Sequence, residues 1–166
     1  MQCIHALWSH PLYQKCYSAL IDAERDRVYC RHDITHLLDV ARIASIMNIE
    51  QQAGFSRRVI YAAAVLHDIG KAAQYQDGTP HEIIGADIAH EILQDVCAHE
   101  ETPPFTPDDI EAIVCAIREH RRCPEGSSEL GVLLYAADKA SRACFACAAR
   151  DTCLWPDERK NMTITI

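Results

Sequence analysis

The sequence lacks several features that would place it in a membrane or outside the cell. It has no run of about 18 apolar residues, the minimum for a spanning helix, although 49% of its 166 residues are hydrophobic. Its first residues, MQCIHALWSHP, have neither the basic start nor the apolar stretch of a secretion signal. We therefore expect a cytoplasmic protein with no membrane partner.

Positive charge is also scarce. The chain has 16 Lys and Arg against 24 Asp and Glu, a net charge of -8. Proteins that bind nucleic-acid polymers usually present a positive face to the phosphates, so we expect no such partner. A local basic pocket for a small phosphorylated substrate, in particular a nucleotide, remains compatible with this balance. The oligomeric state stays open, a homodimer included.

Cysteine, by contrast, is abundant. An odd count of nine, without an export signal, indicates reduced thiols and not a disulfide framework. Three thiols, Cys144, Cys147 and Cys153, lie within ten residues near the C-terminus. Together with Cys123 they form a candidate site for a structural zinc ion or an iron-sulfur cluster. Uncommitted thiols used as small core side chains are an equally favoured interpretation.

Strand signals are scarce too, and helical periodicity prevails. Pro11 starts a first predicted helix, and residues 33–52 form a second with a wide apolar arc. A third begins near residue 56 and is predicted to end at Gly70 in a left-handed cap. The pattern predicts an all-α bundle of five to seven helices.

Two later helices carry their own start signals. Thr79 and Thr106 each precede a proline and have an acidic residue three positions on, which predicts two capping boxes. A final helix is expected over residues 128–144.

Four polar residues are embedded in apolar helical segments: His36, His67, Asp68 and Asp138. An ionised carboxylate in such surroundings is expensive to bury without a cation or several hydrogen bonds. A single histidine on an apolar face is more often a hydrogen-bonded core residue, but four anomalies on three helices suggest one shared metal ion. A mixed set of imidazole and carboxylate ligands suits zinc, iron or manganese.

The motifs that contain these residues, HLLDVA from His36, AVLHDIGK ending at Lys71 and YAADK around Asp138, resemble the HD superfamily of metal-dependent phosphohydrolases. The likeness covers roughly residues 30–142. It implies that His36, His67, Asp68 and Asp138 hold a first metal in an HD-domain helical bundle. We predict the HD domain over residues 1–143, with the cysteine-containing tail, residues 144–166, packed on the same domain.

Two further motifs, HEIIGA from His81 and AIREH ending at His120, resemble the additional histidines of the binuclear subset of this superfamily. That subset includes bacterial diadenosine polyphosphate hydrolases and HD-GYP cyclic dinucleotide phosphodiesterases. The resemblance implies a second metal at His81 and His120, with Asp68 bridging the two. The alternative interpretation is that both histidines are ordinary polar residues at helix ends, without a metal. The His-His-Glu and Gly-Tyr-Pro sequences of HD-GYP proteins are missing, so a cyclic dinucleotide substrate is not expected.

The activity that the resemblance implies is hydrolysis of a phosphoester or phosphoanhydride by water activated on one or two divalent ions of iron, manganese or zinc. Asp68 and Lys71 are the candidate catalytic residues. The candidates for binding the substrate phosphate are Lys71, Arg118, Arg121 and Arg122. Ordinary solvated charges at helix ends would give the same sequence pattern.

Two other functions fit the same ligands: a di-iron oxygenase of the superfamily, and a non-catalytic metal- or nucleotide-binding regulatory module. His32, one helical turn before His36, either contacts a metal ligand or the substrate or is a residue of the helix entry, and we leave it out of the metal set.

Overall fold

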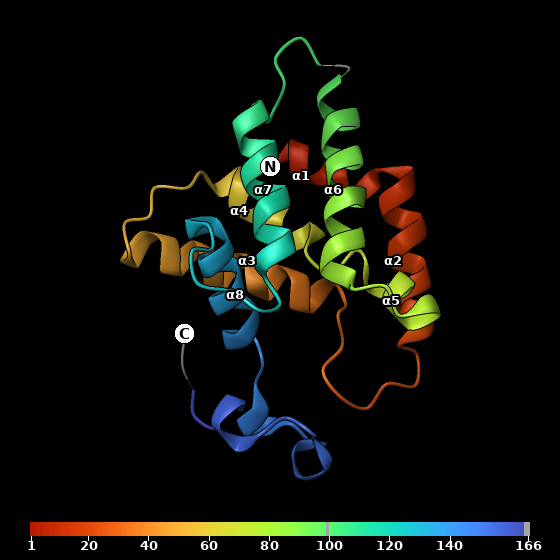
Figure 1. Ribbon diagram of the computed structural model, residues 1–166, viewed down its shortest axis with the longest axis vertical. Coiled ribbons are helices and arrows are strands. Elements are labelled where there is room, and N and C mark those ends of the chain that lie inside the picture. The colour runs from red at the N-terminus through yellow and green to blue at the C-terminus, as the bar shows by residue number, and fades with distance from the viewer. Residues whose placement is uncertain (99, 165–166) are drawn as a thin grey trace.

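The computed structural model describes residues 1–98 and 100–164, which form eight α-helices and three short 3-10 helices without a β-strand (Figure 1). The all-α prediction is confirmed. The helices are α1 (Gln2–Ser9), α2 (Pro11–Ala23), α3 (Ile34–Glu50), α4 (Arg57–Leu66), α5 (Lys71–Asp77), α6 (His81–Ala98), α7 (Pro107–Glu119) and α8 (Glu129–Ala140), followed by η1 (Cys144–Ala146), η2 (Arg150–Thr152) and η3 (Asp157–Arg159).

The centre of the bundle is α4, in which seven of ten residues are buried. Helix α3 packs against α4 and α8, while α7 packs against α4, α6 and α8. Large side chains at these contacts are fully buried, among them Leu66, Ile117 and Leu134. Burial of each such side chain stabilises the fold by about 1.5–3 kcal/mol. In the described part of the chain, no helix combines the length and apolar character needed to cross a membrane.

The backbone conformation of Gly70 differs from the predicted left-handed cap. Its φ of -82° and ψ of -5° are right-handed, so it does not form a left-handed cap, and α5 starts at the next residue. The structure requires glycine there for another reason. A Cβ at Gly70 would collide with the carbonyl oxygen of His81 and would lie 2.6 Å from the backbone nitrogen of Gly85. The missing side chain thus lets the turn after α4 pack directly against the start of α6.

One of the two predicted capping boxes is confirmed. At α7 the Thr106 side chain accepts from the Asp109 backbone N–H, and the Asp109 side chain accepts from that of Thr106. The box predicted at Thr79 is wrong among the described contacts. The backbone N–H of His81, the first residue of α6, donates instead to Gln74 Oε1 on α5, at 3.2 Å. The short helix α5, which the sequence did not predict, thus helps to fix where α6 begins.

The C-terminal segment, residues 144–164, lies beyond the end of α8 (Figure 1). Asn161 ties it to that helix, because its Nδ2 donates to the carbonyl oxygens of Lys139, at 2.7 Å, and of Arg142, at 2.8 Å. The predicted boundary between an HD domain and a tail stays a prediction, and the last two residues of that tail, 165–166, lie outside the described residues.

Candidate metal centre

The six predicted ligands come together in one buried cluster where five helices meet. Every one of their side chains is at most 9% exposed. They are His36 on α3, His67 and Asp68 in the turn after α4, His81 at the start of α6, His120 at the end of α7 and Asp138 on α8.

Two of the histidines are oriented by the helix that carries them. The Nδ1 atom of His67 lies 2.7 Å from the carbonyl oxygen of Ala64, and that of His120 lies 2.6 Å from the carbonyl oxygen of Ile117. A carbonyl oxygen only accepts, so both Nδ1 atoms carry the proton. Each Nε2 is therefore left with a lone pair, which is the form that binds a metal.

The other two histidines are oriented by neighbouring helices. The Nδ1 atom of His81 lies 2.5 Å from Gln74 Oε1, an acceptor on α5. The Nδ1 atom of His36 lies 3.2 Å from Ser141 Oγ, just after α8. Both Nε2 atoms again face the cluster, at 3.4 and 3.5 Å from Asp68.

Asp68 lies between two pairs of histidines. Its Oδ2 is 3.0 Å from His67 Nε2 and 3.5 Å from His36 Nε2. Its Oδ1 is 3.4 Å from His81 Nε2 and 3.7 Å from His120 Nε2. One carboxylate oxygen therefore faces each pair, the geometry expected of a carboxylate that bridges two ions.

Asp138 belongs to one of these pairs. Its Oδ1 lies 3.5 Å from His36 Nε2 and 3.9 Å from His67 Nε2. In two groups the ligand atoms all lie within 4.8 Å of one another: His36, His67 and Asp138, and His67, Asp68 and His120.

The donor atoms fit a metal ion and do not satisfy one another. Among the described residues, the buried Nε2 atoms of His36 and His67 have no hydrogen-bond partner. The Nε2 atoms of His81 and His120 face each other at 3.0 Å, although both rings use their Nδ1 protons elsewhere. A buried polar atom left unpaired costs about 1–3 kcal/mol. Cations between these nitrogens and the carboxylates would remove that cost.

Burial keeps two of these imidazoles in the neutral form. It lowers the pKa of His36, and it lowers the pKa of His81 to about 2 with the help of the nearby Lys71 charge. Burial alone would also lower the pKa of His67, but the negative charge of Asp68 outweighs it and the pKa is raised. A cation bound beside His67 would favour the neutral ring there as well.

The two carboxylates remain ionised in the folded protein. Burial would raise the pKa of Asp68, but His67 and His32 hold it well below its usual range. Burial likewise opposes ionisation of Asp138, but the Arg142 guanidinium outweighs it and lowers that pKa. Both side chains are therefore available as charged ligands near neutral pH.

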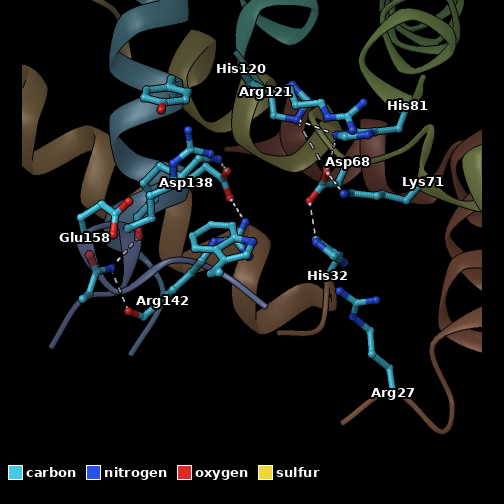
Figure 2. A pocket seen from close by; sticks show the side chains of 15 residues that line it. Arg27, His32, Asp68, Lys71, His81, His120, Arg121, Asp138, Arg142 and Glu158 are labelled. Atoms are coloured by element: carbon cyan, nitrogen blue, oxygen red, sulfur yellow. Dashed lines mark hydrogen bonds and ion pairs between the residues drawn. The ribbon is translucent and has the colours of Figure 1, made fainter. Parts of the chain in front are cut away.

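The cluster opens into a cavity of about 620 Å³ (Figure 2), a size typical of small-molecule sites. Acidic side chains on its wall are Asp68, Asp138 and Glu158. Cationic side chains are twice as many: Arg27, Lys71, Arg121, Lys139, Arg142 and Arg159. An acidic protein thus has a locally basic cavity.

Two of the four predicted phosphate-gripping residues line this cavity. Lys71 Nζ lies 3.9 Å from Asp68 Oδ1, and the side chain is 16% exposed. Arg121 lines the cavity too, and its Nη1 forms an ion pair with Glu82 Oε2 at 3.3 Å.

The other two are not brought there. Arg118 forms an ion pair with Asp87 on the surface, at 2.7 Å, and Arg122 is exposed and not among the residues that line the cavity. Each stands two positions from His120. Two positions rotate a helical side chain by about 200°, which points Arg118 away from the side that His120 faces.

His32, which is not one of the six predicted ligands, also faces the cluster. Its Nε2 lies 3.9 Å from Asp68 Oδ2, and its Nδ1 lies 2.5 Å from Glu24 Oε1. Tyr75 donates to the same Glu24 oxygen at 2.6 Å. Burial would raise the pKa of Glu24, but the hydrogen bond from His32 outweighs it and lowers this pKa to about 2. The spacing of four residues to His36 was the only sequence signal for this placement.

The four candidate cysteine ligands do not assemble. In the described part of the chain, the groups close enough to hold a metal contain only histidine and aspartate. Cys144 is buried at the start of η1, whereas Cys147 and Cys153 end two different 3-10 turns. The predicted zinc or iron-sulfur site at Cys123 and these residues therefore has no structural support.

Comparisons with known proteins agree with this geometry. The profile of the HD domain family matches residues 33–144. An uncharacterized protein of Clostridium beijerinckii is 45% identical over 141 residues, which cover 85% of this chain and 84% of that protein. Ribonuclease Y of Acetivibrio thermocellus is 32% identical over 115 residues, 69% of this chain but 19% of the relative, so the match spans about a fifth of that protein's length.

A solved structure shows the same fold. The crystal structure of a predicted HD superfamily hydrolase from an uncultured Thermotogales bacterium has a TM-score of 0.60 and 23% sequence identity. The match covers 90% of this chain and 81% of that one.

Proposed function

This chain belongs to the HD domain family, and we propose that it is a metal-dependent phosphohydrolase that acts on a small phosphorylated metabolite, in particular a nucleotide. The resemblance and the HD fold predicted from the sequence are confirmed. Because function is argued from the site and not from the fold, one observation carries the proposal. Four imidazole Nε2 atoms converge on two buried carboxylates, and four of these six ligands, Asp68, His81, His120 and Asp138, line a basic cavity.

Each residue of the centre has a defined task. A bound divalent ion would supply a water of lowered pKa and would polarise a phosphoryl oxygen. The residues that would hold one ion are His36, His67 and Asp138, those for a second are His81 and His120, and Asp68 would stand between them.

Two cationic side chains beside the centre would bind the reacting phosphate. Lys71 and Arg121 line the cavity and present several N–H donors, which suit phosphoryl oxygens. Glu82 limits the freedom of Arg121, and Asp68 limits that of Lys71. Both cations are therefore held beside the ligands before a substrate arrives.

The cavity also favours a small substrate over a polymer. Its volume of about 620 Å³ matches a mononucleotide-sized ligand. Residues of the C-terminal segment, among them Trp155 and Glu158, form part of its wall. The ribonuclease Y relatives share about a fifth of their length with this chain, and we do not extend an RNA substrate to it.

A phosphate-release assay tests the proposal. Protein loaded with manganese, iron or zinc is offered a panel of nucleotides and an RNA oligonucleotide, with and without oxygen. We expect phosphate release from a nucleotide in both atmospheres, its loss in Asp68→Asn, and normal activity in the surface control Asp87→Asn. Turnover that stops without oxygen would indicate an oxygenase instead. Metal-loaded protein that turns over nothing would indicate a binding module.

A further inference from the structure

The wall of the cavity is formed partly by residues within the family match and partly by residues that follow it. The match to the HD domain family ends at residue 144. Four residues beyond that point nevertheless line the same cavity as the metal ligands: Trp155, Glu158, Arg159 and Asn161. The segment 144–164 is therefore part of the site, although all of it beyond residue 144 lies outside the family match.

This segment is fixed at several points. The backbone N–H of Phe145 donates to the carbonyl oxygen of Asn161 at 2.9 Å, which closes the segment into a loop. The hydroxyl of Tyr29, in the loop between α2 and α3, donates to the carbonyl oxygen of Thr152 at 3.1 Å. With the bonds from Asn161 to the end of α8, these contacts hold the segment against that helix end and against the loop between α2 and α3.

Trp155 packs against two cations at the end of α8. Its ring centroid lies 4.8 Å from Arg142 Cζ and 5.8 Å from Lys139 Nζ. Lys139 also lies over the ring of Tyr135, at 4.9 Å. Cation–π contacts of this kind are attractive and restrict both side chains, and both cations line the cavity.

Several N–H groups of these cations are not used within the described part of the protein. Arg142 donates from Nη2 to Asp138 Oδ1 at 2.8 Å, and its buried Nε has no partner among the described residues. Lys139 donates to Asp138 Oδ2 at 2.5 Å, which leaves two of its three N–H groups. Arg159 lines the cavity and makes no ion pair within residues 1–98 and 100–164.

We infer that the segment 144–164, together with the end of α8, forms a second anion subsite for the part of the substrate beyond the reacting phosphate. The subsite consists of Lys139, Arg142 and Arg159 beside Trp155. Of these residues, Arg142 lies on the opposite side of the cavity from Lys71 and His81 (Figure 2). The inference rests on the proposed function and specifies its substrate class: a small organic phosphate with a second anionic group, as in a nucleoside diphosphate.

Binding of two inorganic probes to the manganese-loaded protein tests this subsite by calorimetry. Orthophosphate can occupy one position, whereas pyrophosphate can reach both. We expect the wild type to bind pyrophosphate at least about tenfold more tightly than orthophosphate, the value of one charge-assisted hydrogen bond. Arg159→Gln and Trp155→Leu should lose most of this preference, with little change in the orthophosphate Kd.

Arg150→Gln is the matched control, because Arg150 belongs to the same segment, pairs with Asp151 and does not line the cavity. It should keep the wild-type preference. Arg159 is exposed, so Arg159→Gln reports on binding even if Trp155→Leu does not fold. An unchanged pyrophosphate preference in Arg159→Gln overturns the subsite.

The outcome is separable from that of the proposed function. A protein that prefers pyrophosphate through Arg159 but hydrolyses no phosphate compound would retain the subsite and lose the proposed activity. A protein that hydrolyses nucleotides while Arg159→Gln binds both probes as the wild type does would retain the activity and lose the subsite.

Discussion

The histidine–aspartate centre and the segment 144–164 meet at one cavity but are held in different ways. Ligands of the centre stand on five helices or directly after them, and the apolar faces of these helices form the core. Each of the four histidines is oriented by a hydrogen bond at its Nδ1 atom. The segment has three short 3-10 turns and is anchored by a few hydrogen bonds. We infer that the ligands on the helical bundle determine which reaction takes place. The segment, which fewer contacts hold, would determine which substrate binds.

The largest effect is expected at Asp68, since it faces both pairs of histidines. Asp68→Asn keeps the shape of the side chain but removes the negative charge of the carboxylate that would lie between two ions. Metal affinity should fall by more than the roughly 10–100-fold typical of losing an outer contact. Isothermal titration with manganese measures this, with Asp87→Asn as the control. Wild-type affinity in Asp68→Asn would remove this residue from the centre.

A second prediction concerns the close approach of α6 to the turn that carries Asp68. In Gly70→Ala the new Cβ would lie 2.6 Å from the Gly85 nitrogen, so backbone must move. Overpacking of this kind costs about 1–3 kcal/mol or more. The matched variant Gly85→Ala places its Cβ 3.2 Å from the Gly70 nitrogen and should be milder.

Urea unfolding and manganese titration follow both glycine variants. Gly70→Ala should lose stability and metal affinity together, because His81 moves with α6. Equal effects of the two substitutions would show that the close contact at Gly70 does not position the centre.

A smaller effect, on stability, is expected when Glu24, the hydrogen-bond partner of His32, is replaced. Its folded pKa of about 2 lies below the ordinary 4.5, so its contribution to stability is complete above about pH 4.5 and disappears as the pH falls toward 2. Glu24→Gln should therefore be less stable at pH 6 by about 1–3 kcal/mol and lose less stability on acidification. Thermal melts from pH 6 to pH 3 measure this, with the exposed Glu91→Gln as control. Parallel pH profiles for wild type and Glu24→Gln would contradict the assignment.

The smallest effect is expected in the C-terminal segment itself. Because the cysteines are not part of any group that can hold a metal in the described structure, Cys147→Ser should bind as much metal as the wild type. Elemental analysis of both proteins, after loading and gel filtration, tests this. One metal equivalent fewer in Cys147→Ser would restore a cysteine site and weaken the contrast between the two regions.

The centre could be predicted from the sequence because its ligands stand in helices with strong apolar periodicity and family motifs. His32 could not be placed in the same way, since its orientation depends on Glu24 at the end of α2. Arg118 and Arg121 look alike in sequence, but Arg118 lies on α7 and pairs with Asp87, whereas Arg121 lies in the turn after α7 and pairs with Glu82. The contacts of Trp155 depend on the path of a segment without periodicity, which local patterns do not specify.

Anomalous diffraction from crystals grown with manganese would locate the ions themselves. We expect one anomalous peak among His36, His67 and Asp138 and a second beside His81 and His120, with Asp68 between them. No peak at these atoms, or a peak at the cysteines of the C-terminal segment alone, would contradict this expectation.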